Sequence, residues 1–219
     1  MTSPQSESAV DRAQTFIDWT KINAKALTTG AVIIVVAAAG YLFYMRSKQI
    51  QAGNAERALL QAKQSLSAGN MALAQSDLQK VYARYGSTAA GVEAAMLLAQ
   101  IDFDSGKYQD GISVLEKAAG TGAASDNATT IRGLEGDGYA QMGKLPEAGK
   151  AYEAAAAASI MDNEKAFQLA KAARVYQASG DTAKARELWT TLLNDPKTQS
   201  MSSEARIRLG ELSAQVAKR

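Results

Sequence analysis

The sequence contains no cysteine and no histidine among its 219 residues. Without cysteine the chain forms no disulfide, offers no thiol nucleophile and builds no zinc ribbon. Without histidine it lacks the commonest metal ligand and the usual general base. The glycines of residues 133–138 (GLEGDG) follow no strand, so they do not form a nucleotide loop. We therefore predict no catalytic site, no metal, no cofactor and no small-molecule substrate.

Proline and excess charge are also scarce. The only prolines are Pro4, Pro146 and Pro196, and 24 Lys and Arg stand against 22 Asp and Glu. This near balance argues against a nucleic-acid partner, which requires a basic face to neutralise phosphates. Alanine is abundant and β-branched runs are rare outside one segment, so we expect an all-α protein.

That segment is residues 26–45 (ALTTGAVIIVVAAAGYLFYM), a run without charge. As a helix it covers about 30 Å, the thickness of the hydrocarbon layer of a bilayer. Tyr41, Phe43 and Tyr44 crowd its second end, as in an aromatic belt. We predict an uncleaved transmembrane helix at 26–45, between a polar segment (1–25) and a linker (46–54).

Two alternatives to the anchor stay open at this stage, a buried core helix and a cleaved signal peptide. Signal peptides start with a short basic segment, whereas residues 1–25 are long and contain Glu7 and Asp11. Residues 1–10 are expected to be disordered, and residues 11–25 form either a short interfacial helix around Trp19 or a plain flank. Positive charges on the two sides of the run are nearly equal in number, so they do not set its orientation.

The rest of the chain repeats with a period of 37 residues. The glycines that mark the period lie at Gly69, Gly106, Gly143 and Gly180 (106 − 69 = 37). Around them, small residues recur seven before and five after, and large apolar residues recur nine after. These columns are Ala62, Ala99, Gly136, Ala173 and Gly210; Ala74, Gly111, Ala148 and Ala185; and Leu78, Leu115, Tyr152 and Trp189. A fixed period in this range is typical of a solenoid.

Each period is predicted to hold two helices joined at its glycine, because glycine adopts the left-handed conformation of a tight helix end. The four predicted hairpins of the domain 55–219 are 55–68 with 71–85, 91–105 with 108–119, 129–142 with 145–158, and 165–179 with 182–193. A last helix, 203–218, is predicted to cap the stack. Gly210, Leu209, Ile207 and Leu212 would continue the packing, and Arg206, Arg208, Glu211, Lys218 and Arg219 would face water.

The repeat resembles the tetratricopeptide repeat. The closest segments are 138–155 (GYAQMGKLPEAGKAYEAA) and 172–193 (AARVYQASGDTAKARELWTTLL), with Tyr139 and Tyr176 at the usual aromatic position. The first two units depart there, with Ser65 and Asp102. The period exceeds the usual length of about 34 residues, which implies an added turn or longer loops.

The resemblance implies a binding groove lined by the first helix of each unit. Its residues would lie ten, six and three before each glycine: Leu59, Lys63 and Leu66; Met96, Gln100 and Phe103; Gly133, Asp137 and Ala140; Ala170, Arg174 and Gln177. Apolar residues of the first two units would form an exposed patch that binds a partner or is covered by the chain's own helix or by a second copy. The lysine that clamps a carboxylate in some such repeats is missing, since Leu59, Met96, Gly133 and Ala170 stand in its place.

The whole layout also resembles a narrower group, the single-pass inner-membrane tetratricopeptide proteins that are ancillary subunits of the bacterial SecYEG translocon. This resemblance implies a periplasmic body that assists protein translocation or chaperone traffic. Our first hypothesis is therefore a membrane-anchored interaction scaffold. A structural or assembly subunit of another membrane complex is the second hypothesis, and an enzyme or enzyme regulator is the third.

Overall fold

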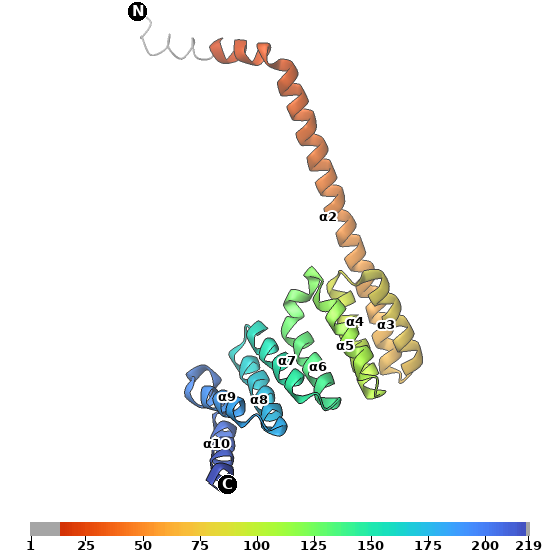
Figure 1. The fold of residues 1–219 in the computed structure, drawn as a ribbon. Coiled ribbons are helices and arrows are strands. Elements are labelled where there is room, and N and C mark those ends of the chain that lie inside the picture. Colours follow the sequence, from red (N-terminus) through yellow and green to blue (C-terminus); the bar gives the residue numbers. More distant parts are fainter. Residues whose placement is uncertain (1–13, 218–219) are drawn as a thin grey trace, which may run out of the picture. The chain divides into compact units, whose positions relative to one another are not determined.

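The computed structural model describes residues 14–217, and every regular element within that range is a helix (Figure 1). This confirms the all-α class. The helices are α2 (Ala24–Ser67), α3 (Met71–Tyr85), α4 (Ala89–Asp104), α5 (Tyr108–Ala119), η1 (Gly122–Asn127), α6 (Ala128–Gln141), α7 (Leu145–Ala158), α8 (Asp162–Ser179), α9 (Thr182–Asn194), η2 (Pro196–Met201) and α10 (Ser202–Ala217).

The chain divides into two compact units, Met1–Ile50 and Gln51–Arg219. In the first unit residues 14–22 are helical, and the rings of Phe16 and Trp19 stack with their centroids 6.3 Å apart. The predicted short helix is therefore present, while its interfacial position stays a prediction. The disorder predicted for residues 1–10 concerns residues outside the described range.

Helix α2 contains the uncharged run. It is long and apolar enough to cross a membrane, and no part of its most apolar stretch is buried within the protein. The run is therefore not a core helix here, and that alternative is wrong. Residues 46–54, including Gly53, are helical as well, so the predicted linker lies within α2.

The second compact part of the chain, Gln51–Arg219, consists of four helical hairpins, the repeat units, followed by α10. The last part of α2 packs against α3 through Leu59 and Leu78, and the pairs α4–α5, α6–α7 and α8–α9 follow in the same order (Figure 1). Each hairpin turns at one of the periodic glycines, and these four glycines have positive φ angles of 72–87°. At Gly106 the end is a Schellman motif, because the next amide, of Lys107, donates to the carbonyl of Asp102 at 2.7 Å. The predicted turns are confirmed.

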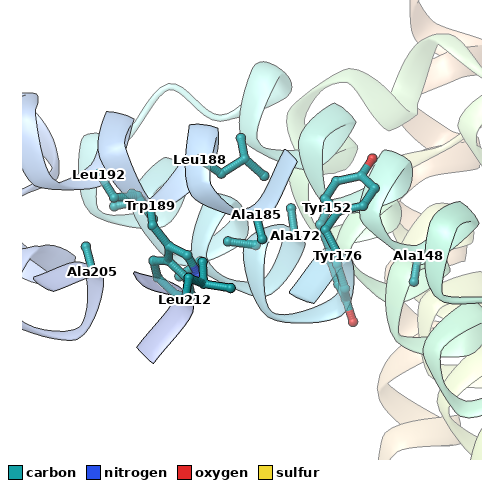
Figure 2. Close-up of a cluster of buried hydrophobic side chains, with 13 residues drawn as sticks. Ala148, Tyr152, Ala172, Tyr176, Ala185, Leu188, Trp189, Leu192, Ala205 and Leu212 are labelled. Carbon is teal, nitrogen blue, oxygen red and sulfur yellow. The ribbon is translucent and has the colours of Figure 1, made fainter. Parts of the chain in front are cut away.

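The three columns of the repeat form the interior. Each hairpin contributes three residues to these columns, at seven positions before, five after and nine after its turn glycine. All twelve are buried. Figure 2 shows how Trp189 lies among Leu188, Leu192 and Leu212 in the last part of the stack. Since a single hairpin cannot bury such a face alone, stacking of neighbouring hairpins supplies the core.

Small residues in these columns and next to them let aromatic rings approach the backbone. A Cβ atom added to Gly136 would lie 2.5 Å from the ring of Tyr152, and one added to Gly149 would lie 2.5 Å from the ring of Tyr176. Real Cβ atoms do not come this close, so only glycine fits under either ring. A large residue facing a small one is thus the packing rule of the hairpins.

The extra length of the period lies partly in long helices, such as the 18-residue α8, and partly in the connections after α5 and α9. Two short helices, η1 and η2, connect α5 to α6 and α9 to α10. Helix α8 begins three residues earlier than predicted, where the hydroxyl of Ser159 donates to the carbonyl of Met161 and accepts from its amide. Asp162 and Glu164 in its first turn favour this start because carboxylates stabilise a helix N-terminus.

Helix α10 packs against α9 and η2, as the predicted end helix should. Among residues 202–214 of this helix, Ala205 and Leu212 are buried. Gly210 was expected to continue the buried small column, but it is exposed, and a Cβ added there would have no described atom within 4 Å. That expectation is wrong because no second helix of a fifth hairpin lies over it in the described range. The predicted outer residues Lys218 and Arg219 lie outside that range.

Candidate interaction surface

The residues ten before the turn glycines do not line an open groove. Leu59 is 2% exposed and packs with Ala62, Leu78 and Leu98 in the core. Gly133 and Ala170 are buried as well, and only Met96 of this column is half-buried. The expectation that Leu59 contributes to an exposed patch is therefore wrong. This column is enclosed by its own hairpin and by the next unit, because Leu59 packs with Leu78 and Leu98 and a Cβ added to Gly133 would lie 3.1 Å from the Gln168 side chain of α8.

The other apolar residues of the expected patch are half-buried. Leu66 packs against the same core as Leu59, while Met96 and Phe103 pack against a neighbouring cluster that contains Leu115. The ring of Phe103 lies against Gly111, where an added Cβ would be 2.5 Å away. The first two units therefore present a smaller apolar surface than the sequence predicts.

The residues six before the turn glycines reach toward the next unit. Lys63 forms an ion pair with Glu93, and Arg174 forms one with Glu204. In both pairs the partner comes 30 residues later (93 − 63 and 204 − 174). It therefore stands thirteen residues before the place of the next turn glycine, which is Gly106 for Glu93 and one period after Gly180 for Glu204. We call the surface formed by these two columns the first-helix surface: Glu56, Lys63, Glu93, Gln100, Thr130, Asp137, Phe167, Arg174 and Glu204.

The first and last junctions of this surface are closed by those ion pairs, whereas the two middle junctions are different. At the same positions the second junction has Gln100 and Thr130, both exposed. The third has Asp137 and Phe167, which do not form an ion pair. The middle of the surface thus leaves Gln100, Thr130 and Phe167 exposed, whereas Asp137 is paired with Lys171 of the next hairpin.

Asp137 holds the third and fourth hairpins together. One of its oxygens accepts hydrogen bonds from the Tyr152 hydroxyl and the Lys171 ammonium, each at 2.5 Å. The Lys171 Nζ atom also lies 4.5 Å from the centre of the Tyr152 ring. Burial, together with the hydrogen bond to Asp137, raises the pKa of Tyr152, so its hydroxyl remains a donor at neutral pH. The predicted site residue Asp137 is thus half-buried and already paired.

Exposed apolar side chains occur just before α8 and in its first two turns. Ile160 is 98% exposed, Met161 is also exposed, and Phe167 is 45% exposed. The Lys171 Nζ atom lies 5.7 Å from the centre of the Phe167 ring. Sequence reasoning missed Phe167 because it considered only the columns ten, six and three before the glycine. The column thirteen before, where Phe167 stands, contains the signal that could have identified it.

The described residues offer little for catalysis. No group of three or more acidic side chains in the range 14–217 is arranged to hold a metal ion. A hollow of about 220 Å³ lies between α5, η1 and α6, and its one charged residue, Arg132, is paired with Glu135.

Stacked helical hairpins with small residues at the crossings define an α-solenoid, a class of protein that binds other proteins. The chain belongs to the tetratricopeptide repeat-like domain family, whose model matches residues 18–132 and again residues 55–170. The two matches begin one period apart (55 − 18 = 37). The family's repeat fold indicates a scaffold for protein–protein interaction.

Solved structures of the same fold support this assignment. One contains nearly identical TPR-like repeats from Podosopora anserina, with 16% identity, a TM-score of 0.54, and coverage of 74% of this chain and 88% of that one. Another is the APC/C hetero-tetramer Cut9–Hcn1, with 19% identity, a TM-score of 0.50, and coverage of 69% and 29%. At these identities the likeness concerns the fold alone. Among curated proteins the search finds no match.

Proposed function

We propose that this protein is a membrane-anchored scaffold that binds other proteins through the middle of its first-helix surface. The observation that carries the proposal is the apolar part of α2. Its large side chains, among them Ile33, Ile34, Leu42 and Phe43, are exposed along the whole stretch. A contiguous exposed apolar surface of this size requires a covering phase or partner, and a bilayer fits its length.

We further propose that the anchor is uncleaved and that the body works beside the bacterial protein-export channel SecYEG or with periplasmic chaperones. The layout of a polar start, one apolar helix and a tetratricopeptide body supports this assignment. The domain boundaries 1–25, 26–45, 46–54 and 55–219 belong to the same proposal.

Anchoring is tested by washing membranes with alkaline carbonate, which strips peripheral proteins. The full-length chain should stay in the membrane pellet with Met1 or Thr2 at its N-terminus. A soluble form that begins near residue 40 contradicts the uncleaved anchor.

Partner binding is tested by co-purification of the full-length chain in mild detergent. Phe167→Glu places a charge in the middle of the first-helix surface and should reduce the recovery of translocon or chaperone subunits. Leu73→Glu is the matched control, because Leu73 is 46% exposed on the second helix α3 and Phe167 is 45% exposed. Recovery of a different membrane complex would favour the role of a structural or assembly subunit, and equal recovery with both variants contradicts the proposed surface.

A further inference from the structure

The helical segment before α2, residues 14–22, has a polar face and an aromatic face. The polar residues recur four and three residues apart, a spacing that places side chains on one face of a helix: Gln14, Asp18 and Lys21. The stacked rings of Phe16 and Trp19 lie on the other side, since each residue advances about 100° around the helix axis. We call these two groups the polar face and the aromatic face.

The aromatic face and the residues beside it are exposed. Phe16 is 64% exposed and Trp19 is 52% exposed, and the flanking Ile17 and Ile22 are exposed as well. Four large apolar side chains within one short helix form a continuous surface, whereas a single exposed apolar residue is common in proteins. A surface of this kind indicates that something outside the single chain covers it.

Continuity with α2 identifies the bilayer as that cover. The uncharged run begins at Ala26, directly after Lys25. A straight helix would place Phe16 about 15 Å beyond the start of the run, in water. The helix is instead interrupted at Asn23, and residues 14–22 run across the direction of α2 (Figure 1). The change of direction brings the aromatic rings closer to the level of Ala26 than a straight helix would.

The polar groups at this corner have partners within the chain. The side-chain amide of Asn23 donates to the carbonyl of Trp19 at 2.9 Å, at the end of the segment. The hydroxyl of Thr29 donates to the carbonyl of Lys25 at 2.8 Å, in the first turns of α2. Because polar groups without partners are costly at the edge of the hydrocarbon layer, these bonds suit a corner at that depth.

We propose that residues 14–22 lie flat in the headgroup layer of the bilayer, with the aromatic face toward the acyl chains and the polar face toward water. This inference rests on the membrane anchor proposed above. Tryptophan is favoured at the headgroup level, and helices with one charged and one apolar face lie in the plane of the interface. Asp18 and Lys21 are the only charges of the segment and cancel each other, so apolar contact holds it rather than attraction to anionic lipid. A flat helix at this end sets the depth of α2 in the bilayer.

Spin labels on single cysteines test the proposal, since the chain has no cysteine of its own. The full-length chain is placed in vesicles of uncharged phosphatidylcholine at a low ratio of protein to lipid. Labels at Phe16→Cys and Trp19→Cys should collide mainly with oxygen, which concentrates in lipid. Labels at Asp18→Cys and Lys21→Cys should collide mainly with a water-soluble nickel complex. Equal accessibility of the two faces overturns the proposal, and so does an aromatic face that neither reagent reaches, because a protein would then cover it.

A label at Ile34→Cys, in the middle of the uncharged run, reports on the anchor separately. If this label lies in lipid while both faces of residues 14–22 are in water, the flat helix is wrong and the anchor stands. If the label at Ile34→Cys is itself in water, the anchor is wrong and the flat helix with it.

The distance between two labels tests the corner at Asn23. In one straight helix, labels at Ile17→Cys and Phe43→Cys would lie about 39 Å apart along the axis, and the change of direction should make their distance clearly shorter. The control pair Leu27→Cys and Ser47→Cys lies within α2 and should keep the about 30 Å of a straight helix. A distance of about 39 Å for the first pair overturns the corner and, with it, the flat helix.

Discussion

The hydroxyl of Tyr176 donates a hydrogen bond to Glu153 at 2.7 Å, and one period earlier Tyr139 donates to Glu116 at 3.3 Å. Each pair joins the second helix of one unit to the first helix of the next. Burial raises the pKa of both tyrosines, and the neighbouring carboxylates add to this rise. The tyrosines that resemble the family's aromatic position thus hold the junctions between hairpins as well as filling space.

The positive φ angle of the turn glycines predicts a specific cost of substitution. Gly143 has a φ angle of 72° and open space around its missing Cβ, so Gly143→Ala is penalised by the backbone alone. We expect a loss of about 1–2 kcal/mol in the free energy of unfolding. Gly120→Ala is the control, because Gly120 ends α5 with a φ angle of −73°. Urea titration followed by circular dichroism measures both, and an equal effect would contradict the role of the left-handed turn.

Trp189 is predicted to be a major contributor to the stability of the last two units. It is fully buried, and removing a buried aromatic side chain costs about 3–5 kcal/mol. Trp189→Ala should clearly lower the melting temperature, whereas Thr190→Ala at its exposed neighbour should not. Thermal unfolding followed by circular dichroism compares them. Melting temperatures that match would show that the packing around Trp189 is misassigned.

The pair Arg174–Glu204 should fasten α10 to α8. The guanidinium contacts both carboxylate oxygens, at 2.8 and 2.5 Å, and it lowers the pKa of Glu204. A double-mutant cycle with Arg174→Gln and Glu204→Gln should give a coupling of about 1 kcal/mol at neutral pH. The same cycle on Lys63 and Glu93 should give less, since lysine lacks the two-pronged contact. No coupling between Arg174 and Glu204 would show that α10 is held by apolar packing alone.

The coupling at Glu204 should also depend on pH in a defined direction. A carboxyl group with a lowered pKa stabilises the fold above its unfolded pKa, and this contribution is lost as the pH falls through the folded value. The cycle should therefore give a smaller coupling as the solution is acidified below that lowered value.

Glu135 should have the opposite pH dependence. It is buried in α6, and burial raises its pKa even though Arg132 contacts both of its oxygens. A carboxyl group with a raised pKa stabilises the fold below its unfolded pKa, and this contribution is lost as the pH rises through the folded value. Glu135→Gln should therefore become more stable relative to wild type as the pH rises from 4 to 7. Exposed Glu147→Gln is the control, and a difference that does not change with pH would contradict this role.

The sequence predicted the hairpins because their determinants are local. A turn glycine such as Gly180 meets a backbone requirement that other residues satisfy poorly, and a small residue such as Ala173 allows close helix crossing. These constraints recur at fixed spacing and can be read without knowing the partner helix. The helix starts were less accurate, as α8 shows, because the hydrogen bonds of Ser159 override the repeat.

The candidate site was less predictable because exposure depends on how closely helices approach. Leu59 occupies a position that resembles a groove position, but it is covered by residues of both neighbouring helices, among them Leu78 of α3 and Leu98 of α4. At Gly210 the prediction was wrong in the opposite direction, because this residue was expected to be buried and is exposed. A small residue indicates a helix crossing only where a second helix is present. Pairing across junctions, as between Arg174 and Glu204, requires knowledge of which units are neighbours.

The Glu–Tyr hydrogen bond recurs at two successive junctions, so the repeat units on either side can in principle replace one another. Glu116 could face Tyr176 as Glu153 does, if residues 117–153, one whole period, were excised. Such a shortened chain should fold with three hairpins and an unchanged end helix, while removal of one residue fewer would rotate every later helix by about 100° and disrupt the stack. Whole repeats, rather than single residues, are therefore the lengths by which this scaffold can be extended or shortened to match the size of what it binds.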